Sequence, residues 1–128
     1  MQFISERLTV VRAANRQPDI ASGAMVREAA ISRGIVGAER IWVGYVELPP
    51  GMVSAPHHHG ECESAIYIIS GQARFRTGEA FANVDVASLG DFVWVPPRLP
   101  HIEENVSKEE AVRMVVVRST QETLVFNL

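Results

Sequence analysis

Cysteine is nearly absent from this chain, since Cys62 is the only one among its 128 residues. A single cysteine cannot form a disulfide within the chain, so a disulfide framework is excluded as the source of stability. Positive charge is also scarce, because 12 lysines and arginines stand against 15 aspartates and glutamates, for a formal net charge of -3. This balance, with no basic run, predicts no broad phosphate-binding surface and no nucleic-acid partner.

Long apolar runs are missing as well, although 47% of the residues are hydrophobic. No window is long enough to span a membrane, and charged Glu6 and Arg7 interrupt the opening stretch where a secretory signal needs an apolar segment. We therefore expect a cytoplasmic protein that does not bind membranes. The length fits a single domain over residues 1–128 with one core, and is too short for two ordinary domains.

The sequence does contain short segments that are rich in β-branched and aromatic residues and are separated by Gly, Pro, Asn and Asp. Many short strands in one small domain indicate an all-β sandwich or barrel. The segment 24–32 has mixed character, and its pattern assigns it neither to a helix nor to a strand. The strands are predicted over residues 40–48, 64–71, 72–78, 91–97 and 111–119.

Three of the four histidines are consecutive, in the stretch APHHHGECES at residues 55–64. Because successive side chains of a strand point to opposite faces, His57 and His59 project to one side and His58 to the other. A third ligand has to come from elsewhere, and His101 is the remaining histidine. Three imidazoles with a nearby carboxylate are the donor set of a transition-metal site. The competing interpretation is a solvated polar loop without a ligand role.

The segments around these histidines resemble the two motifs of the cupin family. GMVSAPHHHGECESAIYIISG (51–71) is similar to the first motif, with its glycine, His-x-His, glutamate and second glycine. GDFVWVPPRLPHIEEN (90–105) is similar to the second, with its glycine, proline, histidine and asparagine. The resemblance implies a double-stranded β-helix, the jelly-roll cupin barrel, which is often dimeric. Residues 1–40 would then form an N-terminal arm or add strands to the barrel.

The resemblance also implies one divalent transition metal, manganese, iron, nickel, zinc or copper, bound by His57, His59, Glu63 and His101. Many cupins are oxygenases, isomerases or decarboxylases, so we expect a metal-dependent protein that acts on or binds a small oxygenated molecule in the barrel. Two alternatives stay open, a non-catalytic binding or sensing module and a metal-free protein like the sugar-nucleotide epimerases. We expect a homodimer, in which an N-terminal strand covers an edge of the partner's sheet.

Two positions depart from the motifs. Seven residues instead of six separate Glu63 from Gly71, so either a bulge turns Glu63 inward or Ser64 occupies the inward position. In the second case three histidines and water would be the ligands, and our prediction takes the first. Arg98 stands where the second motif has glycine, and a positive φ there would cost a non-glycine residue about 1 kcal/mol. The alternative is that PPRLP makes a turn that avoids a positive φ.

Glu103 lies midway between His101 and Asn105, so in a straight strand all three side chains face the same way. A carboxylate inside a barrel is costly to bury unless it is paired, liganded or catalytic. Glu103 is therefore the predicted general acid or base, or a fourth ligand if Glu63 faces outward. The alternative is a bulge that sends Glu103 into solvent.

Other polar residues near the motifs are predicted to have ordinary roles. Arg74 and Arg76 lie on one face of their strand and Phe75 on the other, and a solvated face is expected for the arginines instead of a carboxylate site. Cys62 is expected to be a structural or exposed thiol, since nothing at a suitable spacing would activate it.

Overall fold

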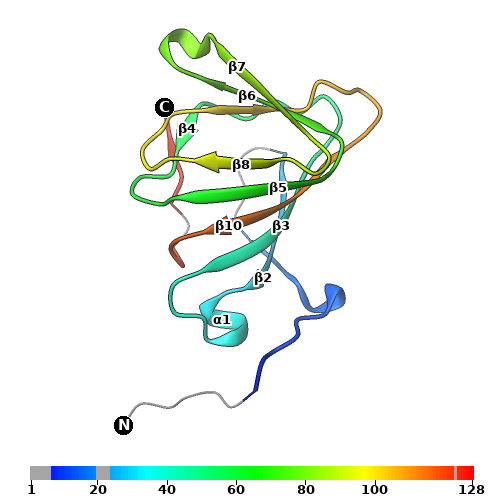
Figure 1. The fold of residues 1–128 in the computed structure, drawn as a ribbon, viewed down its shortest axis with the longest axis vertical. Coiled ribbons are helices and arrows are strands. Elements are labelled where there is room, and N and C mark those ends of the chain that lie inside the picture. Colours follow the sequence, from blue (N-terminus) through cyan, green and yellow to red (C-terminus); the bar gives the residue numbers. More distant parts are fainter. Residues whose placement is uncertain (1–6, 20–23, 123) are drawn as a thin grey trace.

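The computed structural model describes residues 7–19, 24–122 and 124–128. Two antiparallel sheets face each other around one apolar core (Figure 1). The larger sheet has the strand order β1-β2-β3-β10-β5-β8, the smaller has β7-β6-β9, and β4 pairs with β11. The strands are β1 (Gln17–Pro18), β2 (Val26–Ile31), β3 (Trp42–Leu48), β4 (His57–His58), β5 (Ser64–Ser70), β6 (Gln72–Thr77), β7 (Asn83–Ser88), β8 (Phe92–Val95), β9 (Ile102–Glu104), β10 (Val112–Arg118) and β11 (Phe126–Asn127).

Every strand pairing in the described residues is antiparallel, and the predicted all-β jelly roll is confirmed. Each predicted strand is present with its ends moved by one or two residues, and the unassigned segment 24–32 contains β2. The remaining elements are a short helix, α1 (Arg33–Val36), and two 3-10 turns, η1 (Ala13–Asn15) and η2 (Glu79–Phe81). No helix in the described part of the chain is long and apolar enough to cross a membrane.

Alternation along the strands builds the core and also places charged residues inside it. In β10, the side chains of Val112, Met114 and Val116 are buried at every second position. Fully burying an aliphatic side chain of this size contributes about 1.5–3 kcal/mol. The same alternation continues to Arg118, which is also buried. A guanidinium therefore reaches the interior of the barrel at the end of a hydrophobic strand.

Arg98 does take the backbone conformation that the second motif gives to glycine. Its φ is 61°, in the left-handed region. The Arg98 backbone N–H donates to the Gly60 carbonyl at 2.7 Å, and its Nη1 donates to Oε2 of Glu61 at 2.5 Å. These bonds tie the turn to the loop after the histidines, so the barrel tolerates the strained residue.

Candidate metal centre

Three histidines from two neighbouring segments meet inside the barrel. His57 of β4 and His101 form an antiparallel bridge, with backbone N–H to carbonyl distances of 3.1 and 2.9 Å in the two directions. His59 follows on the same side, with its ring centroid 4.9 Å from that of His57 and 5.2 Å from that of His101. One ring nitrogen from each of the three lies within 4.8 Å of the others. The structure thus brings together the three predicted imidazoles.

Backbone carbonyls fix the orientation of all three rings. Nδ1 lies 2.7 Å from the Ala55 carbonyl in His57, 2.7 Å from the Leu124 carbonyl in His59 and 2.9 Å from the Leu99 carbonyl in His101. A carbonyl oxygen only accepts, so each Nδ1 carries the proton and each Nε2 keeps a free lone pair. The buried Nε2 of His101 has no hydrogen-bond partner within the described residues. A metal ion would satisfy that atom, so the residues present fit the group.

Burial keeps the imidazoles of His57 and His59 uncharged. Desolvation lowers the pKa of His57, and the neighbouring His101 adds to the effect. Desolvation likewise lowers the pKa of His59 to about 4, with further contributions from His101 and His57. Neutral imidazole is the form that binds metals, so at neutral pH His57 and His59 need to lose no proton before binding.

His58 faces the other side of the strand, as the alternation predicts. Its ring stacks on Phe126 of β11, with ring centroids 5.0 Å apart and an interplanar angle of 17°. Its Nδ1 accepts a hydrogen bond from the Gly60 N–H at 3.0 Å. His58 therefore holds the last strand against β4 and does not join the cluster.

The structure does not bring Glu63 to the histidines. Its side chain is exposed, and its Oε1 accepts a hydrogen bond from Nε1 of Trp94 on β8 at 2.7 Å. β5 pairs regularly with β10 from Ser64 to Ile68, and the register shifts only after Ile68. The expectation that a bulge turns Glu63 inward is therefore wrong, because the extra residue is absorbed at the far end of the strand. Ser64 is buried and lines the interior beside His59.

Glu103 points into the barrel from β9. Its side chain is 7% exposed, and its Oε1 lies 3.7 Å from Nε2 of His101. Of the two predicted geometries, the structure therefore has the straight strand. Asn105 is also buried, but its amide donates to the carbonyls of Leu48, Pro49 and Glu110 at 3.1, 3.2 and 2.7 Å. Asn105 thus fastens the loop after β9 and has no part in the site.

Sequence reasoning missed Arg27 of β2 and Arg118 of β10. Both line a small cavity that His59, His101 and Glu103 also line. Its volume is about 20 Å³, roughly the space of one water molecule. The periodicity of β10 contained a signal for Arg118, since it follows three buried positions at intervals of two.

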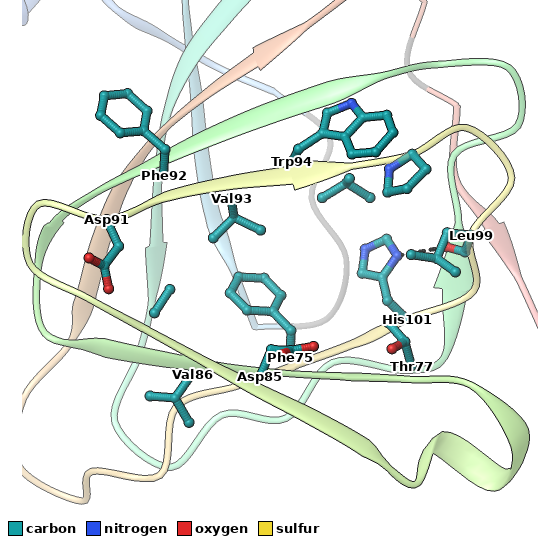
Figure 2. Close-up of a pocket in the computed structure, with 13 residues that line it drawn as sticks. Phe75, Thr77, Asp85, Val86, Asp91, Phe92, Val93, Trp94, Leu99 and His101 are labelled. Carbon is teal, nitrogen blue, oxygen red and sulfur yellow. Dashed lines mark hydrogen bonds between the residues drawn. The ribbon is translucent and has the colours of Figure 1, made fainter.

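A wider groove reaches the same histidine from the outside (Figure 2). It has a volume of about 540 Å³, and Phe75 of β6 and Val93 of β8 face into it. His101 lies at one end, beside Leu99. His101 and Val95 line both the groove and the small cavity, so a molecule in the groove would end next to the histidines.

An antiparallel jelly roll with three convergent imidazoles in its interior defines a class of barrel that can bind a metal. The family model described as "Cupin domain" matches residues 44–118, which is more than half of the chain. The chain therefore belongs to the cupin family.

Solved structures of the same fold include enzymes of different activities. The polyketide cyclase RemF from Streptomyces resistomycificus is 20% identical, with a TM-score of 0.79 over 95% of this chain and 86% of that one. The S161A mutant of Bacillus subtilis oxalate decarboxylase OxdC is 24% identical, with a TM-score of 0.75 over 91% of this chain and 31% of that one. A recombinant oxalate oxidase in complex with glycolate is 19% identical, with a TM-score of 0.67 over 80% and 54%.

These identities show a shared fold and no more. The chain spans about a third of the decarboxylase and about half of the oxidase. No curated protein sequence matches it significantly.

Proposed function

We propose that this cupin is a metal-dependent enzyme that acts on a small oxygenated molecule. The observation that supports this most directly is the set of three inward imidazoles with each Nδ1 bonded to a backbone carbonyl. Such bonds fix the tautomer and orientation of metal-ligating histidines in proteins generally. A solvated histidine loop would have no need of them.

In this proposal His57, His59, His101 and Glu103 bind one divalent transition metal. Imidazole and carboxylate donors suit manganese, iron, nickel, zinc and copper, and they do not single out one of them. Two ligands of one ion lie at most about 4.2 Å apart, twice a bond of about 2.1 Å. The three nitrogens already lie within 4.8 Å of one another, so the site needs only a small closure. Glu103 replaces Glu63 as the carboxylate because it is the one beside His101.

When bound, the metal would supply a Lewis acid with positions open to an oxygen atom of the substrate. The chain's own contribution is to orient that substrate and exclude water. Phe75 and Val93 give the groove an apolar lining, and His101 lies where the groove meets the interior. Glu103 places a carboxylate next to the same histidine.

The test is elemental analysis of protein purified without added metal. Wild type should contain about one transition metal per chain, and His101→Ala should lose it because a ligand is removed. His58→Ala is the matched control, since this histidine adjoins His57 but stacks outside the site on Phe126. Equal metal content in all three proteins would contradict the proposed centre.

A turnover screen then separates an enzyme from a binding module. The metal-loaded wild type would be assayed for O2 uptake and substrate loss with catechols, diketones and hydroxy acids. Turnover that disappears in His101→Ala supports the proposal. Binding without turnover for every compound would instead assign the chain to the non-catalytic cupins.

We also propose that the chain associates into a homodimer. Leu8 and Val10 are large apolar residues that are exposed in the single chain, and they precede the edge strand β1 in the sequence. An edge with apolar neighbours favours pairing with a second copy. Light scattering at micromolar concentration should give twice the mass of the chain, and a monomer mass would contradict this.

A further inference from the structure

Two arginines inside the barrel make no hydrogen bond to a carboxylate of the described residues. Arg27 and Arg118 are 8% and 3% exposed, and they project from β2 and β10 on the two sides of β3. Nε and Nη1 of Arg27, and Nε, Nη1 and Nη2 of Arg118, make no hydrogen bond to any described residue. A buried cationic donor without a hydrogen-bond partner is costly, because its lost hydration is not replaced. Such a pair needs an explanation beyond packing.

The contacts that these arginines do make leave most of their donors unused. The Arg118 guanidinium lies 3.9 Å from the centroid of the Trp42 ring, and its Nη2 is 3.9 Å from Oδ2 of Asp19. That separation is too long for a hydrogen bond. Nη2 of Arg27 lies 3.6 Å from the Met25 sulfur, which is a weak acceptor.

Trp42 and Gly44 hold Arg118 in a defined place. A Cβ at residue 44 would lie 2.2 Å from the Trp42 ring and 2.6 Å from the Glu28 carbonyl oxygen. The indole ring can lie across this position only because residue 44 is glycine. Arg118 stacks on that ring, so its guanidinium is oriented before any ligand arrives.

The described charged groups that line the cavity carry more positive than negative charge, which favours binding of an anion. Of the described charged groups that line it, Arg27 and Arg118 are positive and Glu103 is negative. Asp19 lies beside Arg118 and outside this lining, with its side chain 21% exposed. A divalent ion on the histidines would add two further positive charges. The interior would then hold more positive than negative charge, in a place where few waters can screen it.

We propose that Arg27 and Arg118 bind the carboxylate of a small organic acid, the substrate class of this site. The planar fork of a guanidinium matches the two oxygens of a carboxylate. The cavity of about 20 Å³ holds roughly one water molecule, so a planar carboxylate would need it to widen slightly and a bulkier tetrahedral anion would need it to widen more. The inference deepens the proposed function, on which it rests for the reaction, but carboxylate binding itself depends on the arginines.

Acetate and glycolate are the probes, with glycolamide as the neutral match of glycolate and sulfate as a tetrahedral anion. Binding would be measured by calorimetry and thermal denaturation on both EDTA-treated and metal-loaded protein. Wild type should bind both carboxylates and neither control. Arg27→Met and Arg118→Met should bind glycolate at least about tenfold more weakly, since each loses charge-assisted hydrogen bonds.

The matched control is Arg113→Met on β10, whose exposed side chain lies on the outer face and contacts Glu47. It should bind glycolate as wild type does.

Without any ligand, Arg27→Met should melt at the same temperature as wild type or higher, because an unpaired charge has been removed. A structural arginine would give the opposite result. If a methionine variant does not fold, Arg27→Lys and Arg118→Lys keep the charge, lose the fork and should also bind more weakly.

Equal glycolate affinity in wild type and the arginine variants would overturn the inference, as would sulfate binding as tight as glycolate, or no carboxylate binding by wild type. The proposed metal centre is tested separately, by comparing the metal content of His101→Ala with that of wild type. Glycolate binding by EDTA-treated protein that requires Arg27 and Arg118 supports the inference even if no metal is found.

Discussion

Two pairs of arginines in this barrel differ in whether they are hydrogen-bonded to a carboxylate. On the outer face of the smaller sheet, Arg74 and Arg76 both bond to Glu104, at Nε to oxygen distances of 2.7 and 2.5 Å. In the interior, Arg27 and Arg118 have no carboxylate within hydrogen-bonding distance among the described residues. Among the described residues, the pair that is a third exposed has a hydrogen-bonded carboxylate, whereas the buried pair has only Asp19, at 3.9 Å from Nη2 of Arg118.

Under the proposal above, the outer arginines have a structural role and the inner arginines bind a ligand. Glu103 and Glu104 are neighbours on β9, yet alternation sends one toward the histidines and the other toward the outer arginines. Burial alone would raise the pKa of Glu104, but hydrogen bonds from Arg74 and Arg76 outweigh it and lower that pKa. The two arginines lie opposite buried Phe75 and are a third exposed, but the solvated face that the sequence predicted also fixes a buried carboxylate.

The largest expected effect comes from removing the carboxylate of the outer pair. Glu104→Gln should lower the free energy of unfolding by about 2 kcal/mol, less than a fully buried pair would lose, because both arginines are partly exposed. Urea denaturation measures this, and Glu103→Gln is the control on the adjacent residue. A larger stability loss in Glu103→Gln than in Glu104→Gln would break the comparison.

Next in size is the effect of Glu103 on the metal. Glu103→Gln replaces a charged oxygen donor with a neutral one, so metal affinity should fall by about tenfold or more. Competition with a chromogenic chelator measures the affinity, and Glu63→Gln is the control because its carboxylate bonds to Trp94 outside the site. Unchanged affinity with turnover reduced by about a hundredfold would instead make Glu103 the general acid or base.

A smaller effect is expected from pH on the metal-free protein. Burial depresses the pKa values of His57 and His59 in the fold, whereas the unfolded chain protonates them near pH 6.5. As pH falls from 7 to 5 the unfolded state therefore binds more protons, and stability declines. The melting temperature in EDTA should drop by about 5 °C or more over this range. His59→Gln should show a shallower slope, and equal slopes would contradict the assignment.

The smallest effect is expected at Glu63. Its hydrogen bond to Trp94 is exposed, so Glu63→Gln should change the free energy of unfolding by less than about 0.5 kcal/mol. Metal content should equal that of wild type. A loss of metal in this variant would restore the sequence-based ligand set and remove Glu103 from the centre.

Local spacing predicted a sandwich or barrel and the pair His57 and His59, while the jelly roll and the place of His101 rested on the resemblance to the two cupin motifs. Alternation placed His57 and His59 on one face, and antiparallel pairing brought His101 to them. The position of a bulge is not local, since the pairing of β5 with β10 decides that it falls after Ile68. Counting residues from Glu63 to the next glycine therefore detected the extra residue and misplaced it.

The inner arginines were missed for a different reason. A charged residue at the end of a strand is usually solvated, so Arg118 was not expected to be buried. In the structure, however, it continues the alternating series of buried residues in β10. Its partner Arg27 comes from β2, in a segment to which the sequence assigned no structure. Only the assembled sheet shows that the two arginines both approach the ring of Trp42.

The last strand has a consequence for how the site is formed. The Leu124 carbonyl bonds to Nδ1 of His59, Asn127 pairs with His57, and Phe126 stacks on His58. The order of residues 124–128 and the alignment of two proposed metal ligands are thus coupled equilibria, and coupling of this kind is reciprocal. Metal should protect this segment from proteolysis and slow its amide exchange, while cutting it away should weaken metal binding by the same free energy. An ordered segment 124–128 would therefore indicate that a metal ion is bound.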